Sequence, residues 1–223
     1  MKPDKVIRSK HRKKTIAIEV TEEGEVVLRV PLNTKDVEIE RIILKNKDWI
    51  KKKRVEILSK AKITRKEFKE GEKFLFLGRE YPLKAIRPQD KPLKFSREGF
   101  VLSDRHSKVA KEIFVKWYKD KAKRIISERI KFYAKRCSLP YDRVRITSAN
   151  KRWGSCSKRG NLNFSYRLIM APLSVIDYVV VHELCHIKER NHSRNFWKLV
   201  ESIMPDYKTY KDYLKNNGYL LRI

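Results

Sequence analysis

Three of the five histidines in this 223-residue chain lie within the eleven residues HELCHIKERNH, which begin at residue 182. Residues four apart on a helix share a face, so His182 and His186 are able to meet one metal ion. Zinc binds imidazole nitrogens at about 2.0–2.1 Å. Glu183 is turned by about 100° around the helix from His182. It is therefore placed to reach a water molecule bound to the metal and not to act as a metal ligand itself. The pattern predicts a zinc site with Glu183 as the general base of a hydrolysis.

A catalytic zinc site takes a third protein ligand and keeps one position for water. His192 is the first candidate, because it lies six residues after His186 and past the expected end of the helix. The chain must turn back there, and Asn191 is the residue best able to adopt a left-handed conformation. Glu201, from the next helix, is the alternative ligand. The competing interpretations are ordinary surface histidines and a closed structural zinc site, which would favour cysteine ligands.

The elements around this segment predict a small α/β unit. The metal helix is expected over 175–188, with Ser174 and Asp177 resembling a capping box at its start. Cys185 faces away from the two histidine rings and is expected to be a small buried side chain. The neighbouring elements are, in chain order, a strand over 143–149, a loop over 150–160, a strand over 161–172, a helix from Ser193 to Pro205 and a last helix over 206–215.

The preceding sequence predicts hairpins and helices. Alternating apolar residues predict strand pairs over 15–30, 74–86 and 92–103, and helical spacing predicts one or two helices over 36–61. A long helix without Gly or Pro is expected over about 105–136. We therefore expect an α+β protein in three parts: a basic β-rich part (1–103), a connecting helix (104–137) and a zincin-like domain (138–223). In this last domain, a small sheet should pack on the HExxH helix.

The net charge of +28 is uneven, because residues 1–137 carry +20 of it. Such an excess favours anionic partners such as nucleic acid or nucleotides. The alternative is a soluble surface rich in Lys and Glu. No segment has the apolar length of a secretory signal or a membrane span, and the three cysteines form no CxxC pair. We expect a cytoplasmic protein with reduced thiols and no membrane association.

Several segments together resemble the YgjP-like metallopeptidase family. They are RWGSCS (152–157), NLNFSYRLIMAP (161–172), IDYVVVHELCHIKERNHS (176–193) and FWKLVESIMPDY (196–207), with VIRSKHRKKTIAIEV (6–20) and DWIKKK (48–53) in the N-terminal part. The family consists of predicted zinc-dependent hydrolases of the zincin group, which also includes the SprT-like proteases. The resemblance implies that His182, His186 and His192 bind zinc and that Glu183 is the catalytic base.

Three functions fit these features. The first is a metallopeptidase acting on a peptide or protein, because HExxH most often serves peptide hydrolysis. The second is a metal-dependent hydrolase of nucleotides or phosphate anhydrides, and the third is a nucleic-acid-associated protease or binding module. Residues 161–171 could pair with an extended peptide substrate. The candidates for stabilising the oxyanion of the reaction are Tyr207, Tyr210, Arg167 and Asn150.

Overall fold

The computed structural model describes residues 2–21, 23–64, 66–86 and 91–223. The chain forms two compact units, residues 1–65 and residues 66–223. Both contain helices and small sheets, so the expected α+β class is confirmed. Among the described residues, no helix has the length and apolar character that crossing a bilayer requires.

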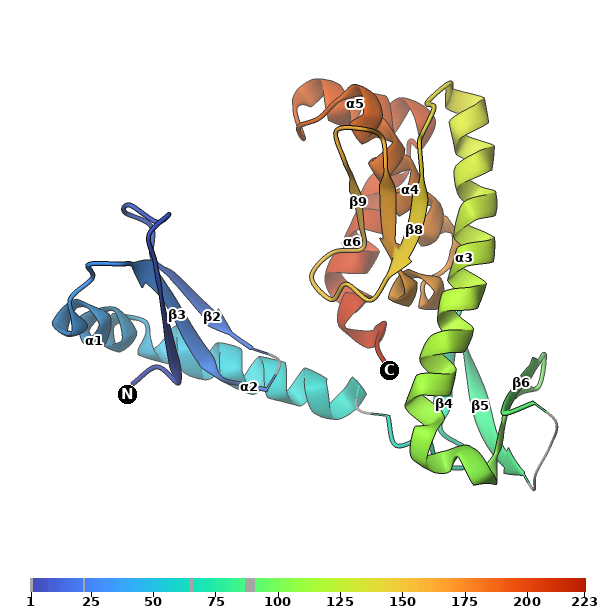
Figure 1. Cartoon of the computed structure of the whole chain (residues 1–223), viewed down its shortest axis with the longest axis horizontal. Helices are drawn as coiled ribbons and strands as arrows, with labels where there is room; N and C mark the ends of the chain where they lie inside the picture. Colours follow the sequence, from blue (N-terminus) through green and yellow to red (C-terminus); the bar gives the residue numbers. More distant parts are fainter. Residues whose placement is uncertain (1, 22, 65, 87–90) are drawn as a thin grey trace. The chain divides into compact units, whose positions relative to one another are not determined.

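The first unit is a three-stranded sheet with two helices (Figure 1). Its elements are β1 (Lys5–Ser9), β2 (Ala17–Val20), β3 (Val26–Pro31), α1 (Asp36–Lys45) and α2 (Lys47–Thr64). The antiparallel β2–β3 hairpin is as predicted, although residue 22 of its turn lies outside the described residues. Alternate residues of β3, such as Leu28, are buried against Ile43 and Ile50 of the helices. Strand β1 pairs in parallel with β3 and was not predicted, because its sequence KVIRS is mostly polar.

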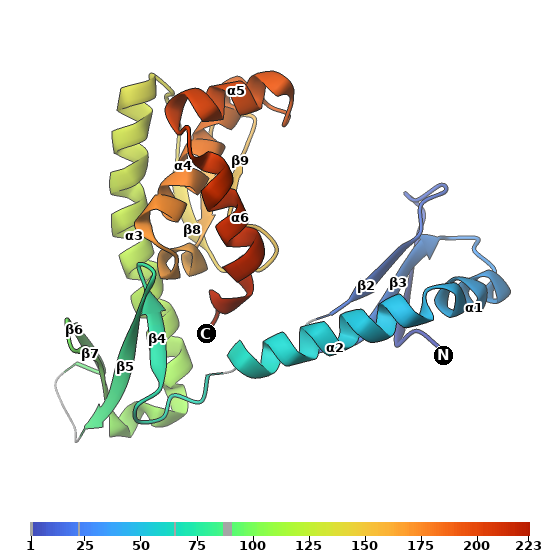
Figure 2. The same cartoon turned by 180° about the vertical axis from the view of Figure 1, so that it is seen from behind.

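The second unit begins with a four-stranded sheet of order β4-β5-β7-β6. These strands are β4 (Lys73–Phe76), β5 (Arg79–Ile86), β6 (Leu93–Ser96) and β7 (Gly99–Ser103). A 3-10 turn, η1 (Asp104–Val109), leads into the long helix α3 (Ala110–Cys137). Figures 1 and 2 both show the start of α3 beside this sheet and its end beside β8 and α4. Helix α3 thus runs along the whole second unit.

The units divide the chain at residue 65, whereas the sequence had suggested a part that extends to residue 103. The reason is that the β4–β7 sheet shares its core with α3, where the Phe74 and Phe114 rings stack at 4.4 Å and Phe100 lies 5.0 Å from Phe114. The β4–β5 turn also bonds to the segment that precedes the HExxH helix, since the Gly78 amide donates to the carbonyl of Met170 at 3.0 Å. Gly78 has a φ of +79°, and a β-carbon there would lie 2.7 Å from Pro172.

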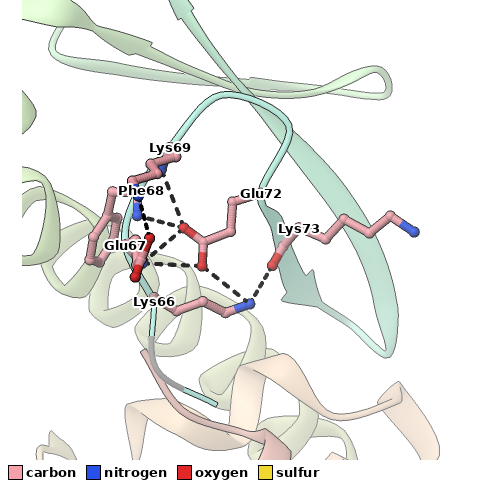
Figure 3. Close-up of polar contacts among 6 residues, drawn as sticks. All are labelled: Lys66, Glu67, Phe68, Lys69, Glu72 and Lys73. Atoms are coloured by element: carbon pink, nitrogen blue, oxygen red, sulfur yellow. Dashed lines mark hydrogen bonds and ion pairs between the residues drawn. The ribbon is translucent and has the colours of Figure 1, made fainter. Parts of the chain in front are cut away.

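A carboxylate fixes the loop that opens the second unit (Figure 3). Glu72 accepts hydrogen bonds from the backbone amides of residues 67, 68 and 69, and the Lys66 ammonium lies 3.9 Å from it. The loop places Phe68, which has a φ of 58°, with its ring 5.4 Å from that of Phe74. One side chain therefore satisfies several donors and attaches the loop to the aromatic core.

The remaining elements form the region that contains the three clustered histidines. They are β8 (Val144–Thr147), β9 (Gly154–Cys156), β10 (Leu162–Ser165), η2 (Tyr166–Met170), α4 (Leu173–Lys188), α5 (Arg194–Ile203), α6 (Tyr207–Asn217) and η3 (Gly218–Leu220). Two expectations were wrong in part. The segment expected as a strand over 161–172 is a strand only to Ser165 and then a 3-10 helix, and the segment 150–160, expected as a loop, contains β9.

Strands β8, β10 and β9 form the small sheet in that order, with β10 in the centre. Strand β10 is parallel to β8 and antiparallel to β9. Helix α4 packs against β9, α3, α5 and α6, so the predicted packing of the HExxH helix near a small sheet is confirmed. Most residues of α4 are buried, which explains why its sequence is apolar before His182.

Candidate metal centre

Helix α4 brings two histidines to one face and a carboxylate to another. His182 and His186 lie one turn apart, with their ring centroids separated by 5.0 Å. Glu183 is 5% exposed and Cys185 is fully buried, so Cys185 is the small buried side chain that the pattern predicts. The burial of Glu183 beside an open histidine face is unusual, because an ionised carboxylate loses hydration there.

The chain turns after α4 so that His192 faces the other two histidines. Its Nε2 atom lies 3.0 Å from Nε2 of His182 and 3.1 Å from Nε2 of His186. The turn begins at Glu189, which leaves the helix in an extended conformation with φ −115° and ψ 102°. The expectation of a left-handed Asn191 was wrong, because the left-handed non-glycine residues of the described chain lie elsewhere. The Ser193 side chain caps α5 by accepting from the Phe196 amide, as predicted.

Arg190 attaches this turn to the neighbouring hairpin. Its guanidinium donates to the carbonyls of Ser157 at 2.9 Å and Lys158 at 2.8 Å. These two carbonyls directly follow strand β9. The position of His192 thus depends on a contact between the α4–α5 turn and the β9–β10 loop, which lie more than thirty residues apart in the sequence.

The three imidazoles fit a zinc ion. The ligand atoms of tetrahedral zinc with Zn–N bonds of 2.0–2.1 Å lie about 3.3 Å apart, and the Nε2 atoms here are 3.0 and 3.1 Å apart. Nδ1 of His186 lies 3.0 Å from the Glu189 carbonyl, so it carries the proton and Nε2 keeps its lone pair. No other group of three or more potential ligands occurs in the part of the chain that the structure describes.

Burial favours the neutral forms of His182, His192 and Glu183 when no ion is bound. It lowers the pKa of His182 to about 3, with smaller contributions from the neighbouring histidines and Lys211, and it lowers the pKa of His192 in the same direction. Burial also raises the pKa of Glu183 to about 8, opposed by the nearby positive charge of Arg152. Neutral imidazoles are the form that binds a metal.

Strand β9 passes directly over the carboxylate. A β-carbon at Gly154 would lie 2.6 Å from both Cγ and Oε1 of Glu183, so a larger residue at this point of the strand would displace the Glu183 side chain. β9 is an edge strand, whereas β10 has a neighbour on each side. The idea that residues 161–171 pair with a substrate was therefore wrong, because the central position of β10 leaves it no free edge.

Aromatic rings extend from the histidines towards α6. The Trp197 ring stacks on the ring of His192 at 5.6 Å and on that of Tyr207 at 5.3 Å. The Lys211 ammonium lies 4.3 Å from the centroid of the Trp197 ring. Neither Trp197 nor Lys211 was singled out from the sequence, because their proximity to the histidines arises only when α5 and α6 fold back on α4.

The other candidates from the sequence lie in different places. Glu201 pairs with Lys208 at 3.7 Å and does not join the histidine group. Arg167 hydrogen-bonds to the side chain of Asn150 and to the Ala149 carbonyl, and among the described residues neither of the two hydrogen-bonds to a histidine of the group. Of the four proposed oxyanion donors, Tyr207 is the one that reaches the aromatic wall of the centre.

An ion pair attaches α4 to α3. The Arg129 guanidinium binds both carboxylate oxygens of Asp177, at 2.5 and 2.7 Å, and the Tyr133 hydroxyl lies 3.3 Å from the same carboxylate. The capping box expected from Ser174 and Asp177 was wrong, since the residue before α4 is Pro172 and no side chain caps the helix. Asp177 instead fixes α4 five residues before the first histidine.

The model of the YgjP-like family, metallopeptidase domain, matches residues 14–217. No curated protein sequence matches the chain. Among solved structures, the chain is similar to a metallopeptidase zymogen, abylysin of Pyrococcus abyssi, with 22% identity and a TM-score of 0.39 over 44% of this chain and 96% of that one.

Proposed function

The chain belongs to the YgjP-like metallopeptidase family, and on this basis we propose that it is a zinc-dependent peptidase. In this proposal His182, His186 and His192 bind the zinc ion and Glu183 is the catalytic residue. The observation that carries the proposal is the convergence of three imidazole Nε2 atoms, 3.0 and 3.1 Å apart, beside a buried carboxylate. Zinc, when bound, lowers the pKa of a coordinated water and polarises the carbonyl under attack.

Glu183 is suited to proton transfer. Its burial raises its pKa to about 8 when no ion is bound, and the positive charge of a bound zinc ion would favour the ionised carboxylate, the form that accepts the proton of the attacking water. The same group then donates that proton to the departing amine nitrogen. Gly154 keeps the backbone of β9 close to the carboxylate, which limits the access of further water.

Strand β9 supports a peptide as the substrate. In the described sheet order β8-β10-β9, one edge of β9 pairs with β10 and the other has no strand beside it. An extended peptide bound along that edge would receive backbone hydrogen bonds from β9. It would also pass next to Glu183, which lies against Gly154. No comparable observation favours a nucleotide as the substrate. Two expectations stay predictions: residues 1–137 bind nucleic acid, and the protein is cytoplasmic.

The test measures metal content and cleavage separately. The purified chain should hold about one zinc per molecule, and His186→Ala should lose it. The zinc-loaded protein should cleave members of a mixed peptide pool, detected by mass spectrometry. Glu183→Gln should keep the zinc and lose cleavage by at least about a hundredfold.

Two results would refute the proposal. Full zinc content in His186→Ala would exclude the ligand assignment. Cleavage of nucleoside triphosphates but of no peptide, by the parent and not by Glu183→Gln, would replace a peptidase with a phosphoanhydride hydrolase at the same site.

A further inference from the structure

A single lysine from α6 lies over the aromatic wall of the metal centre. The Lys211 ammonium is 4.3 Å from the Trp197 centroid, and Trp197 in turn stacks on His192 at 5.6 Å. The ammonium is therefore within about 10 Å of the His192 ring, which is one Debye length at 0.1 M salt. A charge at this distance acts on any anionic group that binds next to the histidines.

The positive charge of Lys211 lies against Trp197, the ring that stacks on His192. This charge would attract a negatively charged group of a substrate that binds beside the histidines.

Lys211 has no acidic partner among the residues that the structure describes. The nearby carboxylate of Glu201 pairs with Lys208, three residues earlier on α6. The Lys211 ammonium makes a cation–π contact with the Trp197 ring, and the residue is otherwise exposed. An exposed cation without an acidic partner beside the three histidines is suited to bind a ligand anion.

We propose that Lys211 is a specificity-determining residue that binds a substrate carboxylate close to the scissile peptide bond. The inference rests on the proposed peptidase function and adds the substrate class: peptides with Asp or Glu beside the cleaved bond, or with a free carboxyl terminus there. A lysine is adequate for this role because a carboxylate on a peptide needs one charged donor. Lys211 acts in substrate binding, and the transfer of protons remains with Glu183.

The test uses binding instead of turnover. The zinc-loaded Glu183→Gln protein is titrated calorimetrically with peptides that differ only in Asp or Asn at one position, and with peptides that end in a carboxylate or an amide. These two arms distinguish an acidic side chain from a terminal carboxylate. We expect the acidic or free-carboxyl member of a pair to bind roughly three- to tenfold more tightly at low salt.

Variants of the lysine then assign that preference. Adding Lys211→Gln should reduce the affinity ratio between the two members of a peptide pair to about one without changing zinc content. Lys211→Glu should reverse the preference towards peptides with Lys. Lys211→Arg should keep the original ratio. Lys215→Gln is the matched control, because it removes an equal charge from the same helix one turn later, and it should leave the ratio unchanged.

Several results would overturn the inference. These are equal or absent binding of both members of every pair, a preference that survives Lys211→Gln, or an equal loss in Lys215→Gln. The proposed function is judged independently by peptide cleavage with the parent protein. A parent that cleaves peptides without any acidic preference would reject the role of Lys211 and leave the peptidase in place.

Discussion

The ion pair between Arg129 and Asp177 gives a sharp prediction about how α4 is held. The Asp177 side chain is 9% exposed and that of Arg129 is 27% exposed, so the carboxylate depends on its partner more than the guanidinium does. Arg129→Met leaves an almost buried carboxylate with only the Tyr133 hydroxyl at 3.3 Å. Breaking a buried pair on one side costs about 3–5 kcal/mol. Because Arg129 is partly exposed, we expect about 3 kcal/mol.

Removing both charges should cost less than removing one. In the double variant Arg129→Met with Asp177→Leu, no charge is left buried, and apolar side chains fill the same space. Replacement of a buried ion pair by apolar residues of similar size is often neutral or stabilising. We therefore expect the double variant to recover at least about 1–2 kcal/mol relative to Arg129→Met alone.

The assay is calorimetric unfolding of the metal-free chain, so that zinc binding does not add to stability. For a unit of this size, a loss of about 3 kcal/mol lowers Tm by roughly 5–10 °C. The reasoning would be refuted if Arg129→Met were less destabilising than Asp177→Asn, or if the double variant were no more stable than Arg129→Met. Either result would mean that desolvation of Asp177 does not dominate at this contact.

Three further predictions concern the site and its supports. Gly154→Ala places a β-carbon 2.6 Å from Glu183 atoms, so peptide cleavage should fall at least about tenfold while zinc content stays constant; undiminished cleavage would contradict this. Glu72→Gln weakens the bonds to three loop amides and should speed hydrogen exchange at residues 67–69, at a cost of about 1–2 kcal/mol; unchanged exchange would show that the carboxylate is not needed. In the metal-free protein burial lowers the pKa of His182 to about 3, so below about pH 6.5 the unfolded chain takes up a proton that the folded state does not. The free energy of unfolding should therefore fall by about 1–2 kcal/mol between pH 7.5 and pH 5, and an equal fall in His182→Gln would assign the effect to other groups.

Local spacing was sufficient to predict which histidines lie together. His182 and His186 share a helix face because of helical periodicity alone, and the buried apolar residues before them follow from the same pattern. His192 was predicted because six residues beyond a helix end allow the chain to fold back. The β2–β3 hairpin and the long helix α3 were predicted for similar reasons, since alternation and 3.6-residue periodicity are properties of neighbouring residues.

Other features depend on contacts between segments that are far apart in the sequence. Asp177 looked like part of a capping box, but it pairs with Arg129, 48 residues earlier, because α3 and α4 pack side by side. The free strand edge belongs to β9 and not to β10, since the order of strands is set by pairing and not by strand length or apolarity. Lys211 looked like one of many surface lysines. Only the folding of α5 and α6 onto α4 places its charge against Trp197 and beside the histidines. The amino-acid sequence therefore determined which residues could carry out the proposed chemistry. The tertiary structure decided that strand β9 and the charge of Lys211 lie beside them, because local periodicity does not encode pairing and packing partners.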